Sequence, residues 1–211
     1  MENVQEFDAD RSARTDDCNV VAFLHRQRTL SLSHVKKSGR RSIHISIAKQ
    51  RLSLKRGRST ERTFPVSTSK FGLGMEEGSM KTPLGRFRVA EKIGDGMPIE
   101  TAYLSREPIH ATAKILRAED LVMSRILWLD GLEPRNANSY SRYIYIHGTN
   151  HEDQIGQPAS HGCIRMKNAD VAELFNLVNV DTRVVIAAPR AKAPNARKTR
   201  NPLPRRNDPP K

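Results

Sequence analysis

The sequence has few cysteines, few aromatic residues and no long apolar runs, and these shortages exclude several classes of protein. Two cysteines among 211 residues exclude a disulfide-rich scaffold and a four-cysteine zinc site. Cys18 and Cys163 act singly or form one bridge. No apolar run approaches the roughly 20 residues that a membrane-spanning helix needs, which excludes a helical integral membrane protein. The acidic N-terminal residues offer no signal-peptide pattern, so no export signal is expected.

Acidic residues are also in short supply. Lys and Arg number 36 against 23 Asp and Glu, which gives a formal charge of +13. The excess is greatest in residues 190–211, where eight basic side chains, one acidic side chain and five prolines predict a disordered basic tail. Residues 1–40 show no sustained apolar period and are expected to be a loosely structured lead. Residues 41–189 then form the folded domain.

The pattern within that domain is mostly typical of strands. Ile43, Ile45 and Ile47 alternate with polar residues, and Leu52 and Leu54 continue the alternation after a short turn, which predicts a hairpin. Further strands are expected at 63–68, 85–93, 121–129, 142–147 and 182–187. One helix is predicted with Asn168 as its N-cap, because apolar residues repeat at spacings of three and four after it. Short strands and one main helix favour a mostly β sandwich or barrel.

Residues 145–166 hold the densest set of reactive side chains. A cysteine attacks an acyl carbon only as thiolate, so a nucleophilic Cys163 needs a neighbouring base or a positive field. His147 at a strand end, Arg165 and the N-terminus of the following helix can supply these. Backbone N–H groups around Gly162 and Cys163 can bind an oxyanion.

Two other interpretations of these residues stay open on composition alone. A lone cysteine in a globular domain is often a small buried apolar residue. Alternatively, the thiol and three histidines are all acceptable zinc ligands, although their spacing fits no standard structural zinc pattern; they are His147, His151, His161 and Cys163. His151 itself is expected to be a solvated loop residue, and Cys18 an incidental thiol.

Three blocks of sequence resemble one known family. The segment 147–166 combines Ile-His-Gly-Thr with Ser-His-Gly-Cys-Ile-Arg-Met, which is similar to the signature of the L,D-transpeptidases, the YkuD-type catalytic domains of peptidoglycan enzymes. Residues 78–87 resemble the family's Lys-Thr-Pro-x-Gly-x-Phe segment, and residues 126–133 its strand and turn before the histidine. The blocks come in the family order over residues 42–188, and the tails match nothing familiar.

The resemblance implies a YkuD-like β-sandwich or barrel with one main helix after the cysteine and flexible tails at both ends. It implies that Cys163 attacks the carbonyl between the third residue of a peptidoglycan stem and the terminal D-alanine. D-alanine leaves, and an amine on a second stem resolves the thioester to give a 3→3 cross-link. His147 serves as base and then acid, and Gly148 orients the imidazole through its carbonyl oxygen.

The resemblance also implies roles for the residues around the thiol. Ser160, His161 and Gly162 are expected to shape the substrate pocket, with His161 contacting substrate or oxyanion. Arg165 is expected to bind a substrate carboxylate or to lower the pKa of the thiol. Lys81 and Thr82 are expected to hold the architecture of the site. Trp128, Tyr143 and Tyr145 are expected to pack in the core, although one tyrosine can face the substrate.

The implied partners are donor and acceptor stem peptides, with carbapenem-type β-lactams as inhibitors, and no cofactor, metal or specific nucleic acid. The expected location is the periplasm or cell wall, despite the lack of a visible export signal. Water or a lipoprotein lysine as acceptor would instead give an L,D-carboxypeptidase or an anchoring enzyme. A non-catalytic, basic polyanion-binding protein is the alternative from another class. The sequence leaves the oligomeric state open.

Overall fold

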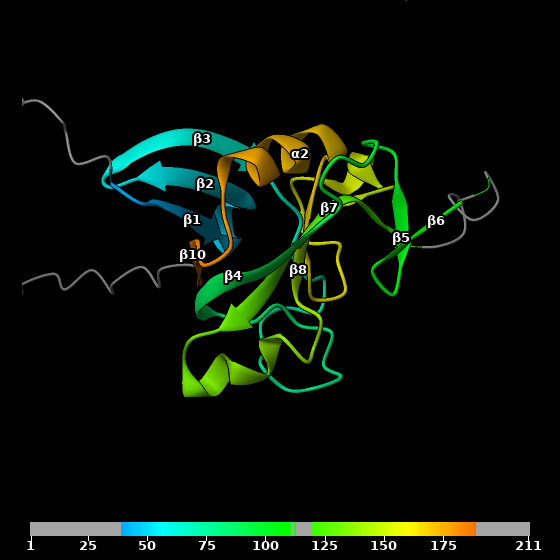
Figure 1. Cartoon of the computed structure of the whole chain (residues 1–211). Coiled ribbons are helices and arrows are strands. Elements are labelled where there is room, and N and C mark those ends of the chain that lie inside the picture. Colours follow the sequence, from blue (N-terminus) through cyan, green and yellow to red (C-terminus); the bar gives the residue numbers. More distant parts are fainter. Residues whose placement is uncertain (1–38, 111, 113–119, 189–211) are drawn as a thin grey trace, which may run out of the picture. The chain divides into compact units, whose positions relative to one another are not determined.

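A computed structural model describes residues 39–110, 112 and 120–188. The described residues form one ten-stranded sheet with the order β3-β2-β1-β10-β4-β7-β5-β6, and β8 and β9 continue from β7 (Figure 1). The strands are β1 Arg41–Ser46, β2 Arg51–Arg56, β3 Ser59–Pro65, β4 Gly85–Ile93, β5 Ala102–Leu104, β6 Glu107–Ile109, β7 Val122–Gly131, β8 Tyr145–Thr149, β9 Ile164–Met166 and β10 Arg183–Ala187. The helices are η1 Ile47–Lys49, η2 Pro134–Ser139, η3 Glu152–Gln154 and α2 Asn168–Leu177. The mostly β fold class is confirmed. The expected tails lie outside the described residues.

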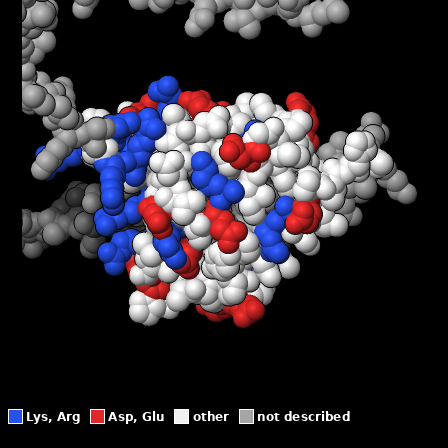
Figure 2. All heavy atoms as spheres, viewed as in Figure 1, with Lys and Arg blue, Asp and Glu red and all other residues white. Residues whose placement is uncertain are grey.

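The predicted first hairpin is confirmed. In the antiparallel pairing of β1 with β2, Ile43 faces Leu54 and Ile45 faces Leu52, and all four side chains are buried. The alternation in the sequence therefore marks the two faces of the sheet. Figure 2 shows Lys and Arg gathered over the end of the sheet that β1, β2 and β3 form.

The turn of this hairpin is tied to a segment that reaches the candidate site. Gln50 has a positive φ of 43° and is buried at 6 % exposure. Its side-chain amide donates to Ile47 O and Thr68 Oγ1, each at 2.8 Å, and its oxygen accepts the Thr68 N–H at 2.8 Å. The segment 66–69 is thereby fixed against the turn. It then pairs with β9 through a bridge of Ser67 to Arg165, and with the loop before β9 through a bridge of Ser69 to Ser160.

Helix α2 packs on β7 and β8. Its apolar side, as predicted, is buried in the main core through Val171, Leu174 and Phe175. The predicted N-cap is wrong by one residue, because Lys167 holds the extended N-cap position and Asn168 is the first helical residue. The Asn168 side chain instead donates to Thr149 O at 3.0 Å, and Glu152 Oε1 accepts the Asn168 N–H at 2.6 Å.

The C-terminal end of α2 is held by a lysine from the sheet. The Lys92 ammonium donates to Phe175 O at 2.8 Å and Val178 O at 2.7 Å, and it lies 4.1 Å from the centre of the Phe175 ring. These carbonyls lack partners within the helix, so a cation here complements the helix dipole. Partial burial lowers the pKa of Lys92.

Two strands begin at residues other than those predicted. The strand expected at 63–68 is β3, which begins at Ser59 because it pairs with β2 from Ser59 opposite Arg56 and leaves the ladder after Pro65. The strand expected at 142–147 begins only at Tyr145, because Tyr143 has a positive φ of 57° within a turn. The three-residue strands β5, β6 and β9 were not predicted. No helix among the described residues is long and apolar enough to cross a membrane.

Candidate active site

The thiol of Cys163 is positioned by the pairing of two parallel strands. Cys163 immediately precedes β9, which pairs with β8 so that Ile164 faces Ile146 and Arg165 faces His147. The half-buried thiol donates to Tyr143 O at 3.2 Å and accepts the Tyr145 N–H at 3.4 Å. The backbone before and at the start of β8 therefore holds the sulfur beside the strand that carries His147.

The His147 imidazole is buried at 4 % exposure and has a fixed orientation. Its Nδ1 lies 2.5 Å from Gly148 O. A carbonyl oxygen only accepts, so Nδ1 carries the proton and Nε2 is left as the basic nitrogen. The ring of Tyr145, whose N–H contacts the thiol, lies edge-on to the imidazole with ring centres 6.4 Å apart. Thiol and imidazole thus border the same tyrosine.

Burial keeps both reactive groups neutral. It lowers the pKa of His147 to about 4, against a smaller opposing effect of the Gly148 carbonyl. Burial likewise raises the pKa of Cys163 to about 11, although the Tyr145 N–H and the charge of Arg165 favour the thiolate. At neutral pH the two groups are therefore a thiol and a neutral imidazole. Attack by sulfur then requires proton transfer to the base as the new bond forms.

The loop before Cys163 is held by its own hydrogen bonds. Ser160 Oγ donates to Cys163 O at 2.6 Å and accepts the Gly162 N–H at 3.3 Å. Gly162 has a φ of 124°, which L-residues rarely adopt. Thr82 Oγ1 accepts the Ser69 N–H and donates to Gly162 O, both at 2.9 Å. Ser160 and Thr82 therefore fix the backbone that presents the thiol.

Arg165 and His161 meet at a carboxylate that the sequence did not single out. Arg165 is 3 % exposed and forms an ion pair with Asp120, whose Oδ2 also lies 3.0 Å from His161 Nδ1. His161 is half-exposed and lies beside the Phe71 ring. The guanidinium of Arg165 is thus occupied by a partner from this chain. No local motif marks Asp120, which precedes β7 far from the Ser-His-Gly-Cys segment.

Aromatic side chains form the wall beside the thiol. Cys163 packs against a buried cluster that contains Tyr103, Ile126, Trp128 and Tyr145. Trp128 stacks on a further ring, Tyr140, with centres 4.1 Å apart. The core positions predicted for Trp128 and Tyr145 are confirmed, whereas Tyr143 is 52 % exposed and lines a pocket of about 360 Å³.

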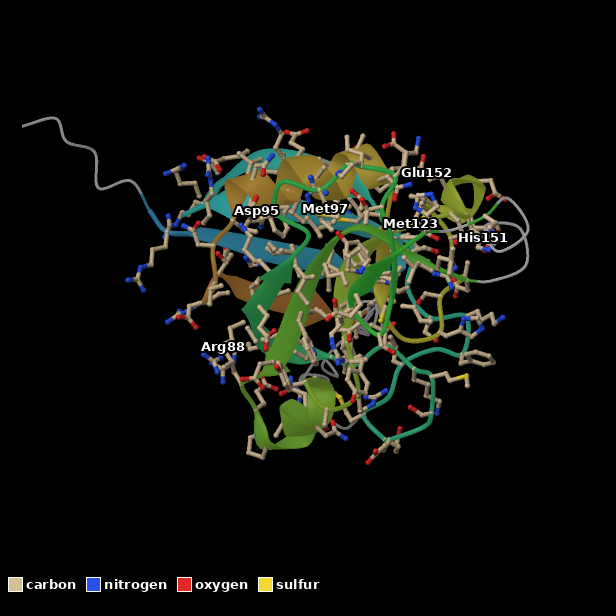
Figure 3. The ribbon with its side chains drawn as sticks, turned by 45° about the vertical axis from the view of Figure 1, so that its right-hand side comes forward. Arg88, Asp95, Met97, Met123, His151 and Glu152 are labelled. Carbon is tan, nitrogen blue, oxygen red and sulfur yellow. The ribbon has the colours of Figure 1, made fainter. Side chains whose placement is uncertain are left out.

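His151 precedes η3 and is partly exposed, in a loop as the sequence predicts. Figure 3 shows it with Glu152 and Met123, on the side of the molecule opposite Arg88. Met123 is paired with Gly148 across β7 and β8, so this side of the molecule carries the end of the strand that holds His147.

Comparison with known proteins agrees with these features. YqjB of Bacillus subtilis, named as an L,D-transpeptidase, is 51% identical over 45 residues, which are 21% of this chain and 26% of that protein. YkuD of Bacillus licheniformis, also named as an L,D-transpeptidase, is 56% identical over 49 residues, which are 23% of this chain and 30% of that protein. The matched stretches thus span less than a third of these relatives' length.

Solved structures of L,D-transpeptidases are similar at lower identity. The enzyme from Mycobacterium smegmatis gives a TM-score of 0.47 at 17% identity, over 71% of this chain and 59% of that one. LdtMt1 in complex with imipenem gives 0.45 at 20% identity, over 70% and 58%. The model of the YkuD family, the L,D-transpeptidase catalytic domain, matches residues 40–186. The chain therefore belongs to the YkuD family of L,D-transpeptidase catalytic domains.

Proposed function

We propose that this protein is a cysteine-dependent L,D-transpeptidase that acts on peptidoglycan stem peptides and forms 3→3 cross-links. One observation carries the proposal: the Cys163 thiol is held by Tyr143 O and the Tyr145 N–H at the start of β8, the strand on which the His147 imidazole is oriented by Gly148 O. Family membership supports the reaction class. Thiol, base and orienting carbonyl supply the parts that an acyl transfer needs.

The reaction then proceeds through two acyl transfers. As Sγ of Cys163 bonds to the carbonyl carbon before the terminal D-alanine, Nε2 of His147 takes the thiol proton. The tetrahedral oxyanion faces the backbone N–H of Cys163, because the Gly162 N–H is directed at Ser160 Oγ. The C–N bond breaks, His147 returns the proton to the leaving amine, and a thioester remains. An amine of a second stem then attacks the thioester carbon and loses a proton to His147. The C–S bond breaks, and His147 returns this proton to Sγ, which restores the thiol.

The neutral state of the pair supports this order of events. A base with a pKa of about 4 is unprotonated across the neutral range and is available when substrate binds. A thiol with a pKa of about 11 stays protonated until the attack. The proton therefore moves within the acylation step rather than before it.

Intact-mass spectrometry tests the proposal. Wild type and Cys163→Ala are incubated separately with imipenem and with a tetrapeptide stem ending in D-alanine. We expect one adduct on wild type, mapped to Cys163, with release of D-alanine from the stem, and no adduct on the variant. A folded wild type that acquires no adduct with either compound would contradict the proposal.

Adding an acceptor stem separates the possible acceptors. A 3→3 dimer identifies a transpeptidase, whereas release of tripeptide alone identifies an L,D-carboxypeptidase. We place the enzyme in the periplasm or cell wall because its substrate lies there. Cell fractionation that finds the untagged protein only in spheroplast cytosol would contradict that location.

A further inference from the structure

The hairpin of β5 and β6 turns through two residues that are unusual for this position. Ser105 and Arg106 have φ values of 51° and 72°, and they connect Leu104 to its cross-strand partner Glu107. A two-residue turn with both φ values positive normally uses Asn and Gly. Left-handed backbone is disfavoured for an L-residue that carries a Cβ. Backbone strain of this kind is common where a side chain has a function.

The turn directs the Arg106 side chain back over the aromatic wall of the candidate active site. Its guanidinium carbon lies 4.9 Å from the centre of the Trp128 ring and 5.2 Å from that of Tyr143. A side-chain hydrogen bond with Tyr145 raises the pKa of Arg106. Cation–π contacts on two rings and this hydrogen bond fix the guanidinium in one place.

A pocket of about 360 Å³ lies directly beside this guanidinium. Its lining comes from the hairpin, from β7, and from the turn before β8 and the first residue of that strand: Tyr103, Ser105, Arg106, Val122, Ile126, Tyr143 and Tyr145. The Cys163 thiol contacts the backbone of the last two of these residues. A peptide bound for attack by the thiol can therefore place a neighbouring group in the pocket. The volume falls within the range of small-ligand sites.

The positive charge of Arg106 in this pocket is available to bind an anion. Among the described residues, no carboxylate forms an ion pair with Arg106, whereas Arg165 is paired with Asp120. Glu91, which lies near these rings, accepts a hydrogen bond from the Tyr140 hydroxyl. A guanidinium has five N–H donors, more than its hydrogen bonds to the Tyr145 and Tyr143 side chains use, and its planar fork suits a carboxylate.

We propose that Arg106 is a specificity-determining residue that binds a carboxylate of the acyl donor in this pocket. The inference rests on the proposed function, because it concerns the donor of that reaction. The donor offers two candidates: the carboxylate of the terminal D-residue and the side-chain carboxylate of the third residue, where that residue is a diamino diacid. Both are the same chemistry, and amidating one at a time distinguishes them.

The experiment measures acylation of Cys163 by intact mass with three tetrapeptide donors. One has both carboxylates free, one has the third side chain amidated, and one has the C-terminus amidated. They are compared on wild type, on Arg106→Gln and on Arg88→Gln, a control outside the pocket lining whose guanidinium is paired with Asp130 and Asp181. Alkylation of Cys163 by the neutral reagent iodoacetamide reports whether the site is intact in each variant.

We expect amidation of one carboxylate to lower kcat/KM of wild type and of Arg88→Gln about 10- to 100-fold, the range for losing a charged hydrogen bond. Arg106→Gln should show little difference between the free and the amidated donor, because its KM for the free donor is raised. Its rate of alkylation by iodoacetamide should stay at the wild-type value. Equal preferences in wild type and Arg106→Gln would overturn the inference and leave the proposed function standing. A wild type acylated by none of the peptides would overturn the proposed function, and this inference with it.

Discussion

The buried imidazole of His147 makes the stability of this protein depend on pH in a way that can be measured. Burial lowers the pKa of His147 to about 4, from an ordinary value of 6.5 in the unfolded chain. Between these values the unfolded chain binds a proton that the folded protein does not bind. The free energy of unfolding therefore falls as the pH drops from about 6.5 to about 4.

The size of the effect follows from the same two values. Each unit of pKa difference is worth about 1.4 kcal/mol. The gap between 6.5 and about 4 therefore amounts to about 3 kcal/mol, present in full above pH 6.5 and lost near pH 4. The side chain is 4 % exposed, so solvent screening reduces this value little. Such a loss is a large share of the stability of an ordinary domain.

Urea unfolding of wild type and His147→Gln at several pH values between 4 and 7.5 isolates this contribution, because all other titrating groups are common to both proteins. We expect the difference in unfolding free energy between them to change by about 3 kcal/mol over this range, with wild type losing more as pH falls. Parallel pH curves would refute the assignment of a neutral, buried base. A wild type that gains stability on acidification would indicate an imidazolium ion paired in the folded protein.

Four further predictions concern the thiol and the elements around it. Alkylation of Cys163 should rise with pH toward a midpoint near 11 rather than 9, and a midpoint at or below 9 in a pH–rate profile would contradict a thiol that is neutral at pH 7. Asp120→Asn should speed this alkylation several-fold at fixed pH, because the carboxylate raises the thiol pKa; an unchanged rate would exclude the coupling. Gly148→Ala should destabilise the protein by about 1–3 kcal/mol in urea unfolding, because the added Cβ would lie 2.7 Å from a backbone oxygen of β7. Lys92→Met should cost about 1–3 kcal/mol by removing two charged hydrogen bonds from the end of α2, and an unchanged melting temperature would show that the cap contributes nothing.

Much of the fold follows from local pattern. Alternating Ile43 and Ile45 predict the first hairpin, because the period of two marks the buried face of a strand. The strand at 85–93 begins and ends where Gly85 and Gly94 bound it. The start of α2 was misplaced, because the carboxylate that accepts the Asn168 N–H, Glu152, lies 16 residues earlier. A cap supplied from another segment leaves no local signal.

The candidate site was likewise predicted only in part from the sequence. The thiol and the imidazole stand in one short stretch of sequence, so their chemistry could be inferred before their geometry was known. Asp120 and Arg106 carry no motif and reach the site only through the sheet, so sequence reasoning missed both. The charge assigned from the sequence to a substrate carboxylate was that of Arg165, which the structure pairs with Asp120.

The hydrogen bonds between the Gln50 side chain and Thr68 limit how this site can be transplanted into another protein. The loop that presents the thiol is secured from outside, by a turn near the start of the domain and by the hydroxyl of Thr82. A chimaera that received residues 160–166 alone would acquire the nucleophile without its supports. A transplant that keeps the geometry must carry Gln50, Thr68 and Thr82 with the loop, although more than 100 residues separate the first of them from the cysteine.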